Sequence, residues 1–219
     1  MPLIFHRYLR PVGELGLWKV QEAEDFFLEH LSLFPKEVTL LKTIKGHRRL
    51  EWLASRWLLH LMSGRDIRGA CLKDQYGKPY LENSFFDISI SHSRELVTVM
   101  AAPQPVGVDI QKLVGKIESI KHKFLRPIEM ESLSKTNHLE HLHVYWGAKE
   151  ALYKAYGRKK LDFKAHIQIN PFDFNLRNGK CFGTIEKDDF QADFELRYEQ
   201  IGDYILVYGA QVVEDDRIA

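Results

Sequence analysis

The segment Trp146–Gly157 carries charged side chains where an amphipathic helix would be expected to bury apolar ones. Lys149 falls on the apolar stripe one turn from Trp146, and Glu150 and Lys154 are four residues apart, so they stand together at its edge. A lysine directed at an apolar surface needs a paired charge or an anionic ligand, because burying a bare charge is costly. The ordinary alternative is an exposed Glu–Lys pair, with Lys149 extending its ammonium to solvent.

A second polar pair lies on an expected strand earlier in the chain. Alternation along that strand puts Asp109 and Gln111 on one face. Together with Glu150, Asp109 would offer two hard oxygen ligands, and Mg²⁺ usually takes one or two carboxylates with water and substrate phosphate. Gln111 can offer one oxygen or hold a water ligand. A turn or cap residue is the structural alternative for Asp109.

Cationic side chains precede this strand. Arg49 and Arg56 are two helical turns apart and point the same way, so they form either a solvated face or a phosphate contact. His92 lies in an expected turn, Ser91–Arg94, where it either orders the turn or donates to a phosphate.

An α+β frame is expected to position these residues, because helical and strand periodicities occur in both halves of the chain. Besides the helix of Trp146, three helical segments are expected. The first is Gln21–Phe34, which Pro35 closes, and the others are Thr43–Met62 and Lys116–Leu133. The expected strands are Pro2–Arg10, Gly16–Val20, Phe86–Ser91, Leu96–Ala102, Val106–Ile110, His166–Asn170, Lys180–Glu186, Asp193–Tyr198 and Tyr204–Val212, with a hairpin turn at Asn178–Gly179.

The pattern breaks near the middle of the chain, at Pro103 and Pro105. We therefore expect an N-terminal lobe over residues 1–105 and a C-terminal lobe over residues 106–219, with the active site between them. Each lobe offers helices and a small, mostly antiparallel sheet, which suggests a pseudo-twofold repeat, although sequence identity between the halves is not evident.

Composition argues against several classes of protein, among them nucleic-acid-binding, membrane-binding and disulfide-rich proteins. The chain has 219 residues and a formal net charge of +1, so no global field attracts it to nucleic acid or to an acidic membrane. Its two cysteines, Cys71 and Cys181, have no metal-ligand spacing and form no disulfide framework. There is no long apolar run and no signal-peptide core, which predicts a soluble cytoplasmic protein.

Four blocks together resemble the 4'-phosphopantetheinyl transferases, in particular the two-lobed, surfactin-synthetase-activating type. They are Gly77-Lys78-Pro79, Ile90-Ser91-His92-Ser93, Gly107-Val108-Asp109-Ile110 and Trp146-x-x-Lys149-Glu150-x-x-x-Lys154. The blocks come in the family's order, at spacings close to the family's, and they span residues 77–154. One block would be weak evidence, whereas four in order are specific.

The resemblance implies a Mg²⁺-dependent transferase that moves the 4'-phosphopantetheine arm of coenzyme A to a serine of an acyl, polyketide or peptidyl carrier protein, releasing 3',5'-adenosine diphosphate. Asp109, Glu150 and Gln111 become metal ligands, and Glu129, Glu150 and Lys154 catalytic residues. The coenzyme A contacts it implies are Arg49, Arg56, Lys78, Pro79, Ser91, His92, Asp109, Lys149 and Lys154. Two pseudo-symmetric lobes would make a monomer self-sufficient.

The chain departs from the family pattern at two places. Gln111 stands where the family often has a glutamate, and Leu125-Arg126-Pro127 stands where it commonly has phenylalanine-serine-lysine, which bears on the geometry of Glu129. If the Glu129 carboxylate is displaced, a water on the metal would have to act as base. Two other functions remain open: a catalytically weak or inactive relative that binds coenzyme A or the carrier, and a Mg²⁺-dependent phosphodiesterase.

Overall fold

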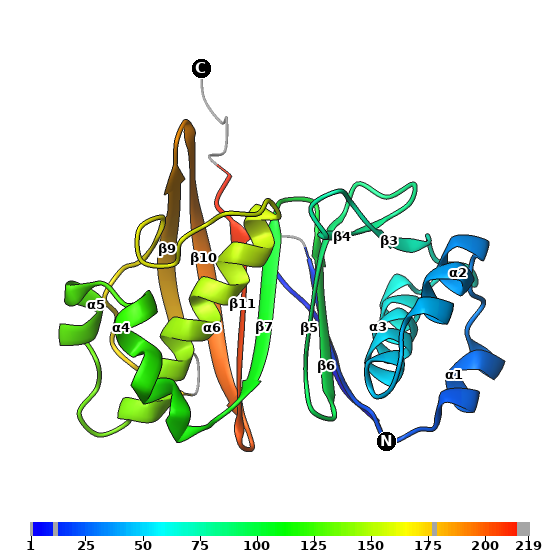
Figure 1. The fold of residues 1–219 in the computed structure, drawn as a ribbon, viewed down its shortest axis with the longest axis horizontal. Coiled ribbons are helices and arrows are strands. Elements are labelled where there is room, and N and C mark those ends of the chain that lie inside the picture. Colours follow the sequence, from blue (N-terminus) through cyan, green and yellow to red (C-terminus); the bar gives the residue numbers. More distant parts are fainter. Residues whose placement is uncertain (1, 11–12, 177–178, 214–219) are drawn as a thin grey trace.

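The computed structural model describes residues 2–10, 13–176 and 179–213 and contains two antiparallel β-sheets, each packed with helices (Figure 1). This is the expected α+β fold. The first sheet, sheet A, has the strand order β1-β2-β6-β5-β4-β3, and the second, sheet B, has the order β7-β11-β10-β9-β8. The chain changes from one sheet to the other between Ala102 and Val106.

Sheet A and its helices use the first half of the chain. The strands are β1 Leu3–Tyr8, β2 Glu14–Lys19, β3 Cys71–Lys73, β4 Pro79–Leu81, β5 Asp87–Ser93 and β6 Leu96–Ala102. The helices are α1 Glu24–His30, α2 Pro35–Thr43 and α3 Arg48–Ser63. Helix α3 ends at Gly64, whose left-handed backbone (φ 59°) lets the chain leave the last turn without strain.

Sheet B and its helices use the second half. The strands are β7 Val106–Lys112, β8 Ile167–Ile169, β9 Gly179–Lys187, β10 Phe190–Ile201 and β11 Tyr204–Gln211. The helical segments are the 3₁₀ turn Gly115–Ile120 and the helices α4 Lys121–Phe124, α5 Pro127–Glu131 and α6 His138–Tyr156. Helix α6 contains the Trp146 segment and ends at Gly157 (φ 67°), as its sequence predicts.

The two sheets form the middle of the molecule, with α3 on the outer side of sheet A and α6 on the outer side of sheet B (Figure 1). Successive side chains of β2 point to opposite faces of sheet A and so enter two different hydrophobic cores. Leu15 and Leu17 pack between the sheets, whereas Trp18 packs toward α3. Between the sheets, Val106, Val108 and Ile110 of β7 meet Leu15 and Leu17 of β2. This shared apolar core joins the two halves.

Side chains of β5 cover the open edge of β7. β7 is an edge strand of sheet B, paired on one side with β11. On its other side, the N–H of Val106 donates to Asp87 Oδ2 (2.9 Å), that of Val108 to Ser89 Oγ (3.0 Å) and that of Ile110 to Ser91 Oγ (3.2 Å). An exposed edge strand invites unwanted pairing, and here the edge is satisfied from the opposite lobe.

Several expected boundaries were wrong. The helix expected from Thr43 begins at Arg48, and Thr43 is the last residue of α2. Pro35 begins α2 instead of closing one long helix, because proline fits the first turn of a helix, where no N–H is needed. The 116–133 region divides into three short helical pieces. β5 continues to Ser93, so His92 lies within a strand and not in a turn. The expected Asn178–Gly179 turn includes residue 178, which is outside the described residues.

Candidate active site

Helix α6 lies directly on strand β7. A Cβ added to Gly107 would come within 1.8 Å of the Ala151 carbonyl oxygen, so only glycine permits this approach. On the helix, Gly147 has the same role, because its Cβ would meet Val207 and the amide of Gln111. The contact brings the second half of α6 alongside Asp109.

A compact polar cluster lies where α6, β7 and β5 meet. Lys154 Nζ donates to Asp109 Oδ1 (2.7 Å), Ser91 Oγ (2.9 Å) and the Val108 carbonyl (2.9 Å). The Ser91 hydroxyl donates to the same Asp109 oxygen (3.0 Å). Asp109 and Ser91 are buried and Lys154 is partly exposed, so the cluster has one accessible side.

Glu150 adds a second carboxylate next to this cluster. Burial, and secondarily the negative charge of Asp109, raise its pKa to about 7, against the opposing effect of Lys154. Among the described residues, neither the Glu150 carboxylate nor Asp109 Oδ2 has a hydrogen-bond partner. Two adjacent carboxylates with free oxygens are stabilised by a hard divalent cation, so the residues present fit Mg²⁺.

This is a two-carboxylate site. Within the described part of the chain, no group of three or more His, Cys, Asp or Glu side chains is arranged to hold a metal ion. A Mg²⁺ ion held here would take most of its shell from water and substrate, which agrees with its preference in phosphate-transfer sites.

Gln111 shares the α6 face of β7 with Asp109 but is engaged elsewhere. Its Nε2 donates to the His143 carbonyl (3.1 Å), and its Oε1 lies 3.1 Å from His143 Nδ1. Burial lowers the pKa of His143, which favours the neutral ring, with Nδ1 donating to Gln111 and Nε2 accepting the Val114 N–H. Both ends of the amide are thus held by helix α6, and the structure does not bring Gln111 to the metal position.

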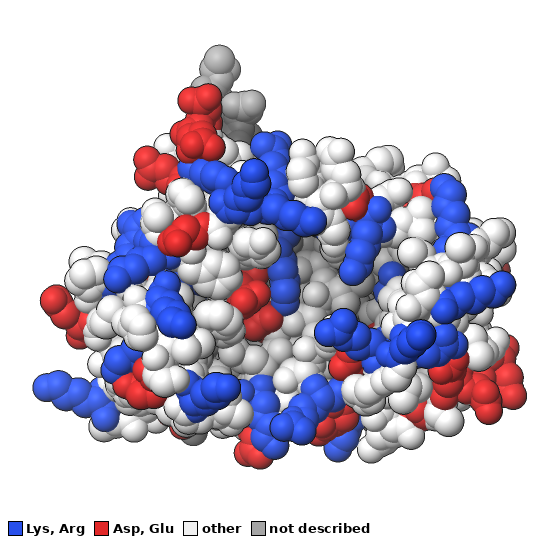
Figure 2. Space-filling model, in the orientation of Figure 1, with Lys and Arg blue, Asp and Glu red and all other residues white. Residues whose placement is uncertain are grey.

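A cavity of about 130 Å³ lies between the lobes, next to Lys154. Its lining includes Tyr76, Lys78, Pro79, Tyr153, Lys154 and Arg158. Figure 2 shows the corresponding hollow, with acidic atoms inside it and Lys and Arg side chains on both sides. The arrangement suits a ligand that carries phosphate groups and a flat apolar part.

Lys78 closes one end of this cavity. Its Nζ donates to Asp87 Oδ2 (2.7 Å) and to the Ala155 carbonyl in the last turn of α6 (3.0 Å). The stem passes over Gly157, where an added Cβ would come within 2.3 Å of Lys78 Cδ. Lys78 therefore links the β3–β4 hairpin to α6, and Pro79 begins β4 beside it.

His92 is separated from Ser91 by the alternation of β5. Ser91 faces β7, whereas His92 faces α3, where its Nδ1 lies 3.2 Å from Glu51 Oε1. The imidazole is half exposed, so its other nitrogen is available to a ligand. His92 and the Asp109 cluster thus lie on opposite faces of one strand.

The two arginines of α3 are occupied by protein groups. Arg49 binds Glu24 and donates to the carbonyls of Leu41 and Ile44, which end helix α2. Arg56 is buried on the Trp52 ring and donates to Ser55 and the Cys71 carbonyl. The expectation that this pair contacts phosphate is not met, because the face they share is covered by α1, α2 and β3.

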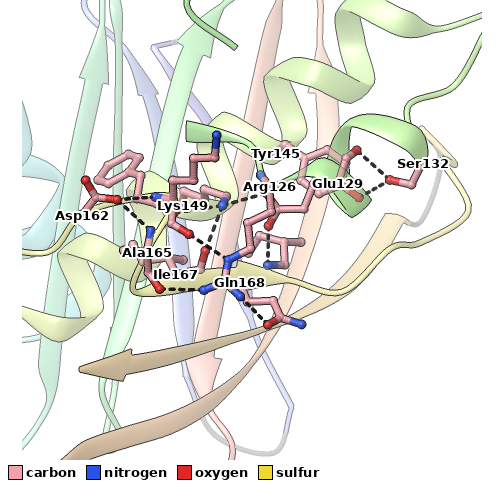
Figure 3. A network of polar contacts seen from close by, with 12 residues as sticks. Arg126, Glu129, Ser132, Tyr145, Lys149, Asp162, Ala165, Ile167 and Gln168 are labelled. Carbon is pink, nitrogen blue, oxygen red and sulfur yellow. Dashed lines mark hydrogen bonds and ion pairs between the residues drawn. The ribbon is translucent and has the colours of Figure 1, made fainter. Parts of the chain in front are cut away.

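Lys149 and Glu129 form a fully buried ion pair inside the C-terminal lobe (Figure 3). Lys149 Nζ lies 2.8 Å from Glu129 Oε2 and donates to the carbonyls of Phe163 (3.0 Å) and Ile167 (2.9 Å). Burial lowers the Lys149 pKa to about 8, against the opposing effect of Glu129. Lys149 has no exposed surface, and each of its N–H groups has an acceptor. The expectation that it contacts coenzyme A in the cavity is therefore not met.

Glu129 is equally committed. Its Oε2 accepts the Arg126 N–H (2.7 Å), which caps helix α5, and its Oε1 accepts the Ile169 N–H of β8 (2.9 Å). Because both oxygens are bonded and no part of the side chain is exposed, the structure corrects the expectation that Glu129 acts as a base.

The N-terminal lobe also contains a buried glutamate that accepts backbone N–H groups and pairs with a cation. The sequence pattern had not led us to expect it. Glu37 is fully buried in the first turn of α2; it accepts the Phe34 N–H, which precedes the helix, and the Cys71 N–H of β3. Its cationic partners are Arg68 (2.9 Å) and, at 3.9 Å, Arg56 of α3.

The two glutamates thus share a structural role in equivalent places. Each follows a proline by two residues at the start of a short helix, as in Phe34–Glu37 and Arg126–Glu129. Each lies within ion-pair distance of a cation from the long helix of its lobe, Arg56 at 3.9 Å or Lys149 at 2.8 Å. The Pro-x-Glu spacing is the sequence signal that could have revealed this repeat.

Comparisons with known proteins point to one family. The family model of the 4'-phosphopantetheinyl transferase superfamily matches residues 105–208. The 4'-phosphopantetheinyl transferase gsp of Aneurinibacillus migulanus is 28% identical over 127 residues, which are 56% of this chain and 50% of that protein. The 4'-phosphopantetheinyl transferase of Bacillus subtilis is 30% identical over 139 residues, 60% of this chain and 58% of that protein.

These matches span between half and about three fifths of the relatives' own length. Among the described residues, no helix is both long and apolar enough to cross a membrane. The matched family segment contains β7 and α6, the elements that supply Asp109, Glu150 and Lys154. Residues 105–208 of the chain thus match the 4'-phosphopantetheinyl transferase superfamily, and both of these relatives are named as such transferases.

Proposed function

We propose that this protein transfers the 4'-phosphopantetheine arm of coenzyme A to a serine hydroxyl of an acyl, polyketide or peptidyl carrier protein, releasing 3',5'-adenosine diphosphate. The observation that carries the proposal is the meeting of Asp109, Glu150 and Lys154 beside a cavity between the two lobes. The family assignment and the names of the two relatives support the reaction class.

Coenzyme A would lie in the hollow with its pyrophosphate at the carboxylate–lysine cluster. Tyr76, Tyr153 and Pro79 line the cavity and offer flat and apolar surface for the adenine. Arg158 and Lys159 on the same wall supply positive charge for phosphate groups. Within the described structure only Nδ1 of the His92 ring has a partner, so Nε2, on the other face of β5, suits the 3'-phosphate.

The reaction needs negative charge stabilised on the pyrophosphate while a hydroxyl is activated. A Mg²⁺ ion held by Asp109 and Glu150 would neutralise charge on the phosphate oxygens. Lys154, fixed by three acceptors, adds a positive charge at the same place.

In the chemical step, the carrier serine oxygen forms a bond to the phosphorus that carries the pantetheine arm. The bond from that phosphorus to the bridging oxygen breaks, and 3',5'-adenosine diphosphate leaves with the electron pair. The serine proton passes to a base at the carboxylate cluster, either Glu150 or a water held beside it, since Glu129 is sealed in the lobe interior.

One chain supplies both walls of the cavity, so we propose that a monomer is the active unit. The basic residues Lys116, Lys121 and Lys123 lie in the 3₁₀ turn and α4 and would suit an acidic carrier protein. Their substitution tests partner binding separately from the chemistry.

Intact-mass spectrometry of an apo acyl carrier protein, incubated with this protein, coenzyme A and Mg²⁺, tests the proposal. We expect a mass gain of one phosphopantetheine, lost on chelation and lost in Asp109→Asn. No gain on several unrelated carriers, with coenzyme A still bound, would make the protein a binding relative. Hydrolysis of coenzyme A without a carrier would indicate a phosphodiesterase.

A further inference from the structure

We infer that Ser91 is a positioning residue, supplied by the N-terminal lobe, that fixes Asp109 and Lys154 of the C-terminal lobe in a single arrangement. This inference rests on the proposed function for its catalytic meaning, while its geometric content stands independently. It replaces the expectation that Ser91 contacts coenzyme A.

The hydrogen bonds of Ser91 use its entire capacity. A serine hydroxyl has one donor and two acceptor lone pairs. Ser91 Oγ donates to Asp109 Oδ1 (3.0 Å) and accepts from Lys154 Nζ (2.9 Å) and from the Ile110 N–H (3.2 Å). With every position taken, the hydroxyl has one orientation and nothing left for a ligand.

Burial supports the same reading. Ser91 is 5% exposed, and it is absent from the lining of the cavity between the lobes. The Asp109 oxygen that it binds also receives Lys154, so Asp109 Oδ2 is the oxygen left for a cation. By holding Oδ1, Ser91 sets the direction in which Oδ2 points.

Without Ser91, the cluster would keep its charges but lose its fixed geometry. Lys154 would retain Asp109 and the Val108 carbonyl, while one of its three N–H donors would have no fixed acceptor. A long side chain with one contact removed gains rotamer freedom, and displacement by even 1 Å is costly for catalysis.

Ser89 provides a matched control on the same strand. It lies two residues earlier, it is 2% exposed, and its Oγ accepts the Val108 N–H of β7 (3.0 Å). It contributes the same type of edge contact between β5 and β7, yet no hydrogen bond joins it to Asp109 or Lys154 in the described structure. Ser89 also lines the cavity between the lobes, so Ser89→Ala is a control for the lost edge contact in kcat and in unfolding, and not a control for coenzyme A binding.

The first experiment compares Ser91→Ala with Ser89→Ala in steady-state transfer to a carrier protein. We expect Ser91→Ala to lower kcat at least about tenfold more than Ser89→Ala, while its KM for coenzyme A stays close to that of the unchanged protein. Ser91→Thr, which keeps the hydroxyl, is expected to recover part of the loss. Equal kcat in the two alanine variants, or a change confined to KM, would overturn the inference.

The second experiment needs no activity and separates failure of this inference from failure of the proposed function. Double-mutant cycles in urea unfolding combine each alanine variant with Asp109→Asn. We expect coupling on the order of tenfold in the unfolding equilibrium constant for Ser91 with Asp109, and almost none for Ser89 with Asp109. Absence of coupling in both cycles would refute the positioning role, whereas coupling in an inactive protein would refute only the transferase.

Discussion

Glu129→Gln distinguishes a structural carboxylate from a catalytic base. The substitution preserves volume but removes the negative charge that Lys149 faces at 2.8 Å. The amide also places an NH₂ group against the N–H of either Arg126 or Ile169, because both backbone groups donate to the carboxylate. The variant thus leaves a buried ammonium without its counter-charge and a buried N–H without its acceptor.

The expected cost follows from complete burial of both partners. Breaking a buried ion pair by removing one member costs about 3–5 kcal/mol, because the remaining charge is uncompensated. Since domains unfold with about 5–15 kcal/mol, the loss takes a large part of the total stability. The double variant Glu129→Gln/Lys149→Met is expected to lose less stability than the sum of the losses in the two single variants. The difference is expected to reach about 3 kcal/mol.

Urea unfolding followed by circular dichroism measures this loss. Glu131→Gln is the control, since Glu131 is an exposed residue of the same helix, and it is expected to change stability by less than about 0.5 kcal/mol. In the folded fraction, Glu129→Gln is expected to keep its kcat. A fall in kcat of a hundredfold or more, with stability unchanged, would identify Glu129 as a base and refute the structural assignment.

Three further predictions concern packing, pH and ligand contact. Gly107→Ala is expected to cost about 1–3 kcal/mol, because its Cβ would collide with α6, whereas Gly115→Ala, with open space around it, should cost little; equal melting temperatures would contradict this. Burial lowers the pKa of His141 to about 4 in the folded protein. As the pH falls, the histidine is therefore protonated in the unfolded chain before it is protonated in the folded one. Stability is therefore expected to fall as the pH drops from 6.5 towards 4, by up to about 3 kcal/mol relative to His141→Phe, and parallel pH profiles would exclude this cause. His92→Ala is expected to raise KM for coenzyme A about tenfold, and much less for 3'-dephospho-coenzyme A. Equal effects on both would place His92 away from the 3'-phosphate.

Local periodicity predicted part of the site correctly. Alternation along β7 put Asp109 and Gln111 on one face, and in the structure both contact α6. The four-residue spacing of Glu150 and Lys154 predicted that they stand together on the helix, and in the structure both lie beside Asp109. These relations depend only on the geometry of one strand or one helix, which a sequence expresses directly.

Relations between distant segments were not accessible in the same way. The apolar stripe of α6 showed that Lys149 needs a partner, but the partner is a glutamate twenty residues earlier, held by its own backbone contacts. Arg49 and Arg56 do share a helix face, yet that face is packed against protein. Periodicity indicates which residues share a face and does not indicate what covers it.

Because both long helices lie next to a buried glutamate, α3 and α6 can be compared position by position. When Arg56 is matched to Lys149, the positions of Glu150 and Lys154 fall on Trp57 and Leu61, which pack in the N-terminal core. The long helices are thus anchored alike, but only one carries charge on the neighbouring positions. The positions that carry charge in α6 are therefore used for hydrophobic packing in α3, so of the two long helices only α6 contributes charged side chains to the cluster at Asp109.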